Sequence, residues 1–416
     1  MSNQSSIKNQ FPIFQKHPDL VYLDSPATTL KPQSVIDSLL SYYTDYTANV
    51  HRGIYKSAER STKEYEETRE VVARFIHAKD SKEVVFTKGT TEALNLLVYA
   101  WGRKYIQKDD EIAITVMEHH SNFVPWQQLA FELGADLKVI DITDDGLLNI
   151  YNSKGEIDLS AIVTSKTKLL SLTYVSNMLG TINPIKQIID CAKKINPQIV
   201  IVVDGAQAVS HFEINVQELG CDFFVFSGHK LMGPTGTGVL WGKYQLLQNM
   251  YPFHFGGEMI QDVSLDHTTF KDAPNKFEAG TPHIAGIIAL KSAINFVQEV
   301  GFNHIQHYEQ QLTLLAKNEL ERNFGSEIII YGPKDIRDRA GLLSFSFGSY
   351  HSHDIAQILD EDDVCVRAGH HCTMPLHKRL NVVASTRASF YIYNTEKDVE
   401  KLVNGLEKVR KVLKIK

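Results

Sequence analysis

The sequence predicts an α/β sandwich followed by a smaller α+β domain. Between residues 83 and 241, short apolar runs alternate with longer amphipathic segments, which is the pattern of strands separated by helices. The apolar runs lack a period of two, as expected for parallel strands that helices cover on both faces. After residue 285, long helical stretches precede short strands, and this change predicts the second domain.

The expected elements follow in order along the chain. In the first part, strands are expected at 83–86, 111–116, 137–141, 169–174, 199–203, 223–226 and 238–241. Helices are expected between them at 90–107, 125–133 and 184–195, the last with a proline in its first turn. In the second part, the pattern indicates helices at 285–300, 304–323 and 395–413, and strands at 328–331 and 341–347.

The composition is that of a weakly acidic folded protein. The chain has 416 residues, enough for two or three structural units, and is 43% hydrophobic and 22% charged. The formal charge of −6 argues against a general nucleic-acid binder, because phosphate binding needs a basic surface. No apolar run is long enough for a membrane span, and residues 1–10 lack an apolar signal core. We therefore expect a cytoplasmic protein without a membrane partner.

The four cysteines are Cys191, Cys221, Cys365 and Cys372, and no two form a C-x-x-C pair. A zinc knuckle or a dithiol redox motif is therefore not expected, and free thiols in a reducing compartment are the simple interpretation. Cys191 lies in a helical pattern and Cys221 precedes an apolar strand. Both are expected to be inert packing residues.

Lys230 lies in a glycine-rich turn, residues 227–236, directly after the strand expected at 223–226. The carboxyl end of a buried strand is where α/β folds bind ligands. A lysine reacts with an aldehyde only as the neutral amine, and burial or nearby positive charge lowers its pKa toward that state. The alternative is a surface lysine in a turn.

Further polar residues follow other predicted strands. Asp204 ends the strand at 199–203 and could pair with a protonated pyridine nitrogen, although it could also be only a helix cap. Gln207 could bind a phenolic ring oxygen. Thr90 and Thr91 begin a helix whose N-terminus suits a phosphate, and they also make a good cap.

His119 and Asn177 complete this set. His119 follows the strand at 111–116 and could stack on a pyridine ring, and Asn177 follows the strand at 169–174 and could donate to a ring substituent. Each residue alone has an ordinary structural explanation. Their joint occurrence at the ends of separate strands indicates a site for a phosphorylated pyridine cofactor.

The chain carries motifs at 22–25, 49–53, 118–120, 203–207, 227–230, 277–282, 367–372 and 387–389. In these it resembles the class V aminotransferase-like, fold-type I pyridoxal-phosphate enzymes, and within them the Suf-type (group II) cysteine desulfurases. The resemblance covers nearly the whole chain. It implies a large cofactor-binding domain, 26–285, with a mainly parallel seven-stranded sheet between helices. A small domain, 286–416, would follow, and the segment 1–25 would pack with it.

The resemblance also implies roles for the site residues. Lys230 would bind the cofactor covalently and act as the base, while Asp204, Gln207 and His119 would contact its ring. The residues implied for the phosphate are Thr90, Thr91, Ser227 and His229. Thr281 would reach the phosphate of the partner subunit, which implies a homodimer.

The small domain would supply the substrate side of the site. Arg387 and Asn177 would bind the substrate carboxylate, because a guanidinium matches a carboxylate in shape. Arg367 would position the substrate and the loop of Cys372. Together with Lys230, His119 and Cys372 would be catalytic, and Cys372 would become a persulfide as L-cysteine becomes L-alanine.

Cys372 follows His370 and His371, and we expect positive neighbours to lower the pKa of its thiol. An adventitious thiol is one alternative. A metal site formed by these three residues is another, but adjacent residues rarely reach one ion and no metal is expected. Thr373 departs from the family, where a small alanine is usual.

The sulfur would pass to an acceptor protein of the Suf system, for iron–sulfur clusters. His351 and His353 belong to a solvated loop, or His353 contacts that acceptor, which could contain zinc. Rival functions are an aminotransferase, a selenocysteine lyase and a non-catalytic pyridoxal-phosphate scaffold.

Overall fold

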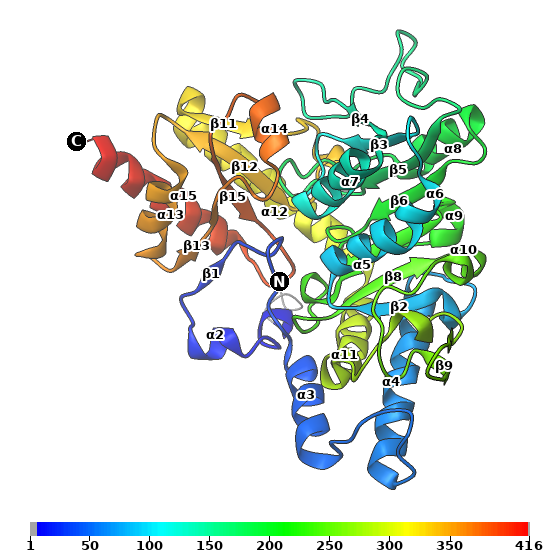
Figure 1. Ribbon diagram of the computed structural model, residues 1–416. Coiled ribbons are helices and arrows are strands. Elements are labelled where there is room, and N and C mark those ends of the chain that lie inside the picture. Colours follow the sequence, from blue (N-terminus) through cyan, green and yellow to red (C-terminus); the bar gives the residue numbers. More distant parts are fainter. Residues whose placement is uncertain (1–5, 415–416) are drawn as a thin grey trace.

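The computed structural model describes residues 6–414 and has a seven-stranded sheet at its centre (Figure 1). The strand order is β2-β8-β7-β6-β5-β3-β4, and only β8 runs antiparallel to its neighbours. The strands are β2 (Val84–Thr87), β3 (Glu111–Thr115), β4 (Asp136–Ile140), β5 (Thr167–Thr173), β6 (Val200–Asp204), β7 (Phe223–Ser227) and β8 (Gly238–Gly242). The prediction of a mainly parallel seven-stranded sheet is confirmed.

The two faces of this sheet are covered by different helices, as β7 illustrates. Phe223 and Val225 pack in the apolar cluster formed with α5 (Thr90–Leu97) and α7 (His120–Leu133). Phe224 and Phe226 point to the opposite cluster, which is larger. The helices on that side are α4 (Lys56–Phe75), α8 (Ile185–Ile195) and α11 (Ile284–Val300). Because both faces are buried, the strand is apolar at every position before Ser227, as predicted.

Two predicted helices differ from the structure. The helix expected at 90–107 is interrupted: α5 ends at Leu97, and a π-helical turn (Val98–Gly102) leads into α6 (Arg103–Tyr105). The helix expected at 125–133 begins at His120, before its proline. The backbone N–H of Ser121 donates to Nδ1 of His119, so a histidine caps this helix. Histidine is not among the usual capping residues, so the sequence signal is weak.

A second sheet lies in the C-terminal part. Its order is β11-β12-β15-β14, all antiparallel. The strands are β11 (Ile328–Tyr331), β12 (Leu342–Phe347), β14 (Arg367–Gly369) and β15 (Ser385–Ser389), and the accompanying helices are α12 (Phe302–Phe324), α13 (Ser352–Asp360), α14 (Met374–Arg379) and α15 (Glu396–Lys414). Arg367 and Arg387 are register partners across β14 and β15. These two short strands carry arginines instead of an apolar run, and the sequence pattern does not predict them.

The N-terminal segment joins this smaller part. β1 (Val21–Tyr22) pairs in parallel with β13 (Val364–Cys365). Residues 1–5 of the expected segment 1–25 lie outside the described residues. The domain boundary near 285 stays a prediction, because α11 packs against α3 (Gln33–Asp45) and α4 of the first part.

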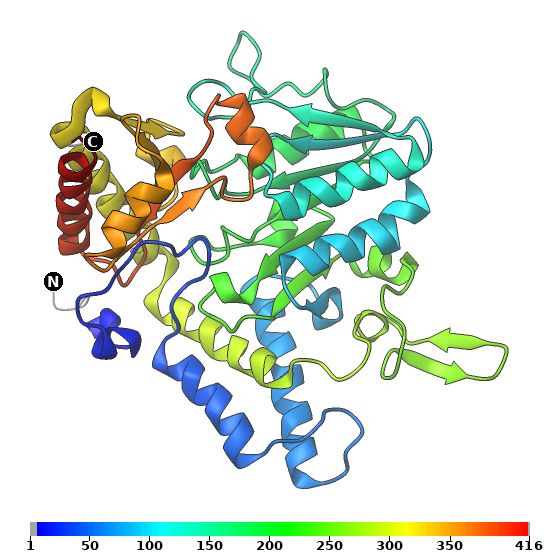
Figure 2. The ribbon, with the colours of Figure 1, turned by 60° about the vertical axis from the view of Figure 1, so that its left-hand side comes forward.

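The remaining elements lie at the edges of the molecule. They are α2 (Ile13–Lys16), α9 (Val216–Leu219), α10 (Tyr244–Asn249), β9 (Ile260–Val263) and β10 (Thr268–Phe270). The hairpin of β9 and β10 projects from the body (Figure 2). Within residues 6–414 no single helix is long and apolar enough to cross a membrane; one pair, Ile284–Val300 and Phe302–Glu327, bent by 74°, passes by length and composition.

Candidate active site

One cavity of about 240 Å³ lies where the carboxyl ends of β5, β6 and β7 meet the C-terminal part. Every residue predicted for the site lines it except Thr281. The residues brought together are Thr90, Thr91, His119, Asn177, Asp204, Gln207, Ser227, His229, Lys230, Arg367, Cys372 and Arg387. They come from widely separated stretches of the sequence.

Lys230 ends the short 3-10 turn Gly228–Lys230 that follows β7. Burial lowers the pKa of its ammonium to about 8. Asp204 and Cys372 act in the opposite direction, while the guanidinium groups of Arg387 and Arg367 lower the pKa further. A substantial fraction of the amine is therefore neutral near pH 8, which is the state that attacks an aldehyde.

The turn of Lys230 is held from the N-terminal segment, which the sequence pattern does not reveal. The carbonyl of His229 accepts hydrogen bonds from the backbone N–H of Thr29 at 3.1 Å and its Oγ1 at 3.0 Å. Nζ of Lys31 donates to the same oxygen at 3.0 Å. Burial lowers the pKa of Lys31 to about 8. These contacts fix the backbone from which Lys230 projects.

Asp204 lies at the end of β6 and is buried. Burial raises the pKa of its carboxyl group, and Lys230 opposes that shift. Oδ1 accepts from the backbone N–H of Ala206 at 2.9 Å, and because residues 206–211 form turns, this bond caps a turn and not a helix. A buried acid at this depth favours a cationic partner, and a protonated ring nitrogen would be one. Gln207 donates through Nε2 to the carbonyl of Pro26 at 2.8 Å.

The N-terminus of α5 forms the proposed phosphate end of the cavity. The backbone N–H of Thr90 donates to Oγ of Ser227 at 2.8 Å, and Oγ1 of Thr91 lies 2.6 Å from Oγ of Ser121. Burial lowers the pKa of His229 to about 4, so its ring is neutral and can donate one N–H. Helix N–H groups, hydroxyls and an imidazole N–H together suit a phosphate.

Thr281 does not line this cavity but a separate pocket of about 150 Å³. Nδ2 of Asn49 lies 3.5 Å from Oγ1 of Thr281. Phe253 and His254 line both that pocket and an open hollow that reaches Thr90 and Thr91. Within one subunit Thr281 therefore does not contact the phosphate end, and the role implied for it in a partner's site stays a prediction.

His119 forms one wall of the cavity as the cap of α7. Burial lowers the pKa of His119 to about 3, and Lys230 adds to the shift. The ring is therefore neutral, and because Nδ1 accepts a hydrogen bond from Ser121, its proton is on Nε2. The preceding Glu118 is buried beneath the site, where burial raises its pKa to about 8.

The two arginines of the cavity share one carboxylate. Oδ1 of Asp24 accepts from Nη2 of Arg387 at 2.8 Å, and Oδ2 lies 3.3 Å from Nη1 of Arg367. Nη1 of Arg387 donates to the carbonyl of Asn177 at 2.7 Å. Nε of Arg387 is buried and has no hydrogen-bond partner within the described residues. Asp24 belongs to the motif at 22–25, but its type and spacing alone do not reveal this pairing.

Cys372 is exposed at the cavity, and both it and His371 have positive φ, +57° and +49°. Nδ2 of Asn177 donates to the carbonyl of His371 at 2.7 Å. His371 does not supply a positive charge beside the thiol, because burial lowers its pKa to about 2. The positive charges around the loop come from guanidinium groups instead. No group of three His, Cys, Asp or Glu within residues 6–414 is arranged to hold a metal.

Cys191, Cys221, His351 and His353 lie outside the cavity. Cys221 is buried, which raises its pKa to about 12, and Cys191 is half-buried, as expected for packing residues. His351 caps α13 by accepting from the N–H of His353 at 3.3 Å. His353 is exposed. Its Nε2 would lie 3.9 Å from a Cβ added to Gly369, so its ring lies beside that residue. An acceptor contact there stays a hypothesis.

The family model Aminotransferase class-V matches residues 21–402. The chain belongs to the class-V aminotransferase family. Among curated members it is 47% identical to a probable cysteine desulfurase of Halalkalibacterium halodurans and 46% identical to a cysteine desulfurase of Yersinia pseudotuberculosis, each over 98% of both chains.

Solved structures of the family agree with this fold. The apo structure of a cysteine desulfurase from Thermococcus onnurineus has a TM-score of 0.90 and 37% identity, over 97% of both chains. The cysteine desulfurase CsdA from Escherichia coli, in an S-sulfonic acid form, has a TM-score of 0.89 and 37% identity, over 98% of both chains.

Proposed function

We propose that this class-V family member is a pyridoxal-phosphate-dependent cysteine desulfurase, which converts L-cysteine to L-alanine and leaves a persulfide on Cys372. The observation that carries the proposal is an exposed thiol in the same cavity as a half-buried lysine and two arginines. Relatives of 46–47% identity over nearly their full length, which are named cysteine desulfurases, support it.

The cavity fits pyridoxal phosphate at both ends. Asp204 offers a buried carboxylate for the ring nitrogen, and the N-terminus of α5 with Ser227 and His229 offers donors for the phosphate. Lys230 lines the same cavity, and burial lowers its pKa to about 8. When bound, the cofactor supplies an aldehyde for the amino group and an electron sink for the bonds at the substrate Cα.

The residues of the chain then have separate tasks. Arg387 and Asn177 bind the substrate carboxylate, and Lys230 removes the proton from Cα. The Cys372 thiolate attacks the substrate sulfur, so that a new S–S bond forms and the Cβ–S bond breaks. The electron pair of that bond stays with Cβ, which takes up a proton, and Lys230 returns the proton to Cα, so that alanine is formed. The proton on Nε2 makes neutral His119 a suitable donor near that step.

We also propose a homodimer in which Thr281 completes the partner's phosphate site. Large apolar side chains are exposed at Ile54 and Tyr55, at Phe255, and at Leu265 in the turn of the hairpin of β9 and β10. Figure 2 shows this hairpin projecting from the body. Such surfaces mark interfaces. The open hollow beside Thr90 and Thr91 leaves room for a hydroxyl from outside the chain.

Subunit complementation tests the dimer. Lys230→Ala and Thr281→Glu subunits are each expected to be inactive, the second because its carboxylate repels the phosphate. In a mixed dimer, one site would combine the intact Lys230 of one subunit with the intact Thr281 of the other. Recovered activity on co-expression supports the shared site, whereas no recovery places Thr281 in its own subunit's site and contradicts it.

The persulfide would pass to an acceptor protein, and we propose a Suf-type acceptor that serves iron–sulfur cluster assembly. A thiol nucleophile requires a reducing compartment, which favours the cytoplasm. Measuring persulfide transfer from Cys372 to candidate acceptors identifies the partner. Transfer to no Suf-type acceptor would contradict this part of the proposal without touching the desulfurase reaction.

The central experiment compares two reactions in wild type and Cys372→Ala. Desulfuration of cysteine, measured as alanine and sulfide formed, should be lost in the variant. Exchange of the α-proton of L-alanine with solvent deuterium needs Lys230 but not the thiol, and should persist. Cys221→Ser is the matched control and should keep both reactions. If wild type does not desulfurate cysteine and transamination survives in Cys372→Ala, the protein is an aminotransferase. If wild type releases selenide from selenocysteine but no sulfide from cysteine, it is a selenocysteine lyase.

A further inference from the structure

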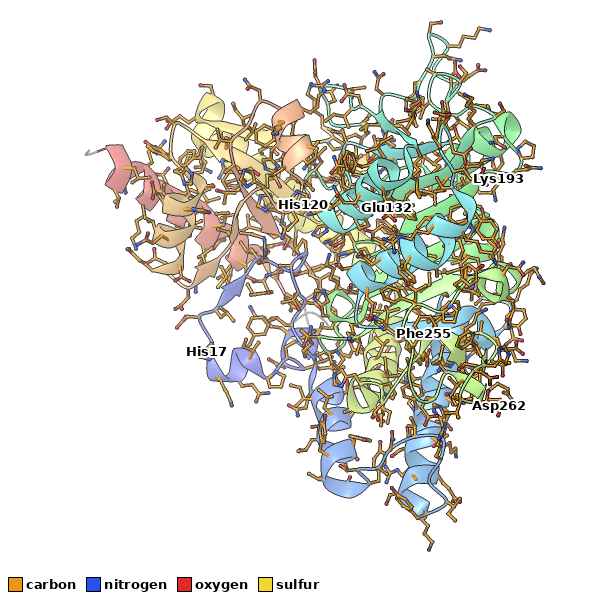
Figure 3. The ribbon with its side chains drawn as sticks, in the orientation of Figure 1. His17, His120, Glu132, Lys193, Phe255 and Asp262 are labelled. Atoms are coloured by element: carbon orange, nitrogen blue, oxygen red, sulfur yellow. The ribbon has the colours of Figure 1, made fainter. Side chains whose placement is uncertain are left out.

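The geometry points to His120 as a positioning residue that holds the Cys372 loop, residues 370–374, at the mouth of the cavity. The inference rests on the proposed function and deepens it. His120 lies at the junction between the two parts of the molecule (Figure 3). It does not line the cavity, although the adjacent His119 does. Its effect on the reaction must therefore act through the loop.

His120 makes two hydrogen bonds to this loop, on either side of Thr373. Its backbone N–H donates to the carbonyl of Cys372 at 2.7 Å. Its Nε2 accepts from the backbone N–H of Met374 at 3.0 Å. Met374 begins α14, where helix N–H groups lack partners within the helix. The ring of His120 thus takes the place of a side-chain cap for that helix.

The acceptor role fixes the chemical state of the ring. A backbone N–H can only donate, so Nε2 must carry its lone pair and the ring proton must be on Nδ1. Burial lowers the pKa of His120, and His370 adds to the shift. The neutral ring that this bond requires is therefore favoured at neutral pH.

The loop needs outside support because its backbone is strained. His371 and Cys372 both have positive φ, a region that residues other than glycine adopt at a cost. Such conformations persist when surrounding contacts hold them. Two further contacts from outside hold His371: Nδ2 of Asn177 donates to its carbonyl at 2.7 Å, and Oγ of Ser385 lies 2.9 Å from its Nε2. The backbone N–H of His377 donates to the carbonyl of Thr373 at 3.1 Å. His120 supplies the hydrogen bonds to Cys372 and Met374 themselves.

A loosened loop would misplace the nucleophile without disturbing the lysine. Attack on the substrate sulfur requires the Cys372 thiolate close to that atom and in line with the Cβ–S bond. Lys230 and its turn are anchored separately by the N-terminal segment. His120 is thus expected to affect sulfur transfer and not the removal of the α-proton.

The test compares His120→Ala with His120→Gln. The backbone bond to Cys372 survives in both, but only glutamine retains a side-chain acceptor for the Met374 N–H. We expect His120→Ala to desulfurate cysteine about tenfold more slowly at saturating substrate. The α-proton exchange of L-alanine should stay within about twofold of wild type, as expected for a change outside the lysine's chemistry. His120→Gln should recover most of the desulfuration rate. Lys378→Ala, an exposed position on α14, is the matched control and should leave both reactions unchanged.

Amide hydrogen exchange gives a measurement that does not depend on the reaction. The Met374 amide should exchange faster in His120→Ala than in wild type, and His120→Gln should restore protection. Equal protection in all three proteins would overturn the inference, as would an equal loss of both reactions in His120→Ala. If wild type performs neither reaction, only the proposed function is refuted. The protection of the Met374 amide still tests whether His120 holds the loop.

Discussion

Asp24 and Arg387 form an ion pair of 2.8 Å between the N-terminal segment and β15. Arg387 is only 2% exposed, and a guanidinium at that depth needs a compensating charge. Asp24 supplies this charge, although it lies in the N-terminal segment, far along the sequence from the small sheet. A substrate carboxylate that binds Arg387 therefore shares the guanidinium with Asp24.

Removing this carboxylate should weaken both the fold and substrate binding. Asp24→Ala leaves a buried positive charge without its partner, and we expect a loss of about 2 kcal/mol in the free energy of unfolding, because Asp24 is partly exposed. KM for cysteine should rise, since Arg387 loses one of its anchors. Asp24→Asn keeps an oxygen acceptor, so its free energy of unfolding and its KM should lie between those of wild type and Asp24→Ala. An Asp24→Ala enzyme with wild-type KM would contradict this role.

The lowered pKa of Lys230 predicts how the apoprotein takes up pyridoxal phosphate. The folded pKa of about 8 is below the ordinary lysine value. The neutral fraction of the amine therefore rises with pH, from about a tenth at pH 7 to about nine tenths at pH 9. The rate of cofactor incorporation, followed by absorbance, should rise through pH 8 and then level off.

Asp204→Asn provides a check on that profile. Because Asp204 raises the pKa of Lys230, its neutralisation should move the midpoint of the profile to lower pH. A wild-type midpoint near the ordinary lysine value would show that the amine is not perturbed.

The central fold follows from the sequence because both faces of its sheet are buried. β6 and β7 are therefore apolar at every position before their terminal residues, Asp204 and Ser227, and those polar residues mark the cavity. β14 and β15 could not be predicted in this way. They carry Arg367 and Arg387, which both pair with Asp24 of the N-terminal segment. The burial of Arg387 depends on that carboxylate, and a buried charge without its partner in view resembles an exposed residue.

The residues that line the cavity were easier to predict than those that hold its loops in place. Lys230 and Cys372 lie in distinctive motifs, whereas the anchors of their loops do not. Lys31 and Thr29 contact the Lys230 turn through a backbone carbonyl. Backbone carbonyls have no residue identity, so no pairing of residue types in the sequence could indicate these contacts.

Gly238 sets the distance between β8 and the phosphate end of the cavity. A Cβ at this position would lie 2.4 Å from the Cα of Gly89, which precedes α5. Because the obstacle is backbone, Gly238→Ala should displace the start of α5 and weaken cofactor binding by about tenfold. Equilibrium dialysis against pyridoxal phosphate measures this.

Gly242→Ala is the matched control on the same strand. Its Cβ would meet the ring of Phe223 at 2.7 Å, away from the phosphate end. This variant should lose stability in thermal unfolding while the folded protein keeps its cofactor affinity. Equal losses of affinity in the two variants would show that Gly238 has no local effect.

Arg339 joins the two parts of the molecule through backbone carbonyls. Its guanidinium is buried and donates to the carbonyls of Pro333, Tyr331 and Leu179, the last at 3.2 Å from Nη1. Burial lowers the pKa of Arg339 to about 10.

Leu179, whose carbonyl accepts from Arg339, lies two residues after Asn177. The carbonyl of Asn177 accepts a hydrogen bond from Arg387. Arg339→Met keeps much of the volume but leaves the carbonyls without donors. We expect a loss of about 3 kcal/mol in the free energy of unfolding, measured with urea, and a higher KM for cysteine. Arg339→Lys should be nearly as damaging, because one ammonium cannot reproduce the planar fork. A methionine variant with wild-type stability and KM would show that Asn177 is held by other contacts, among them the hydrogen bond from Ser344 to the carbonyl of Met178.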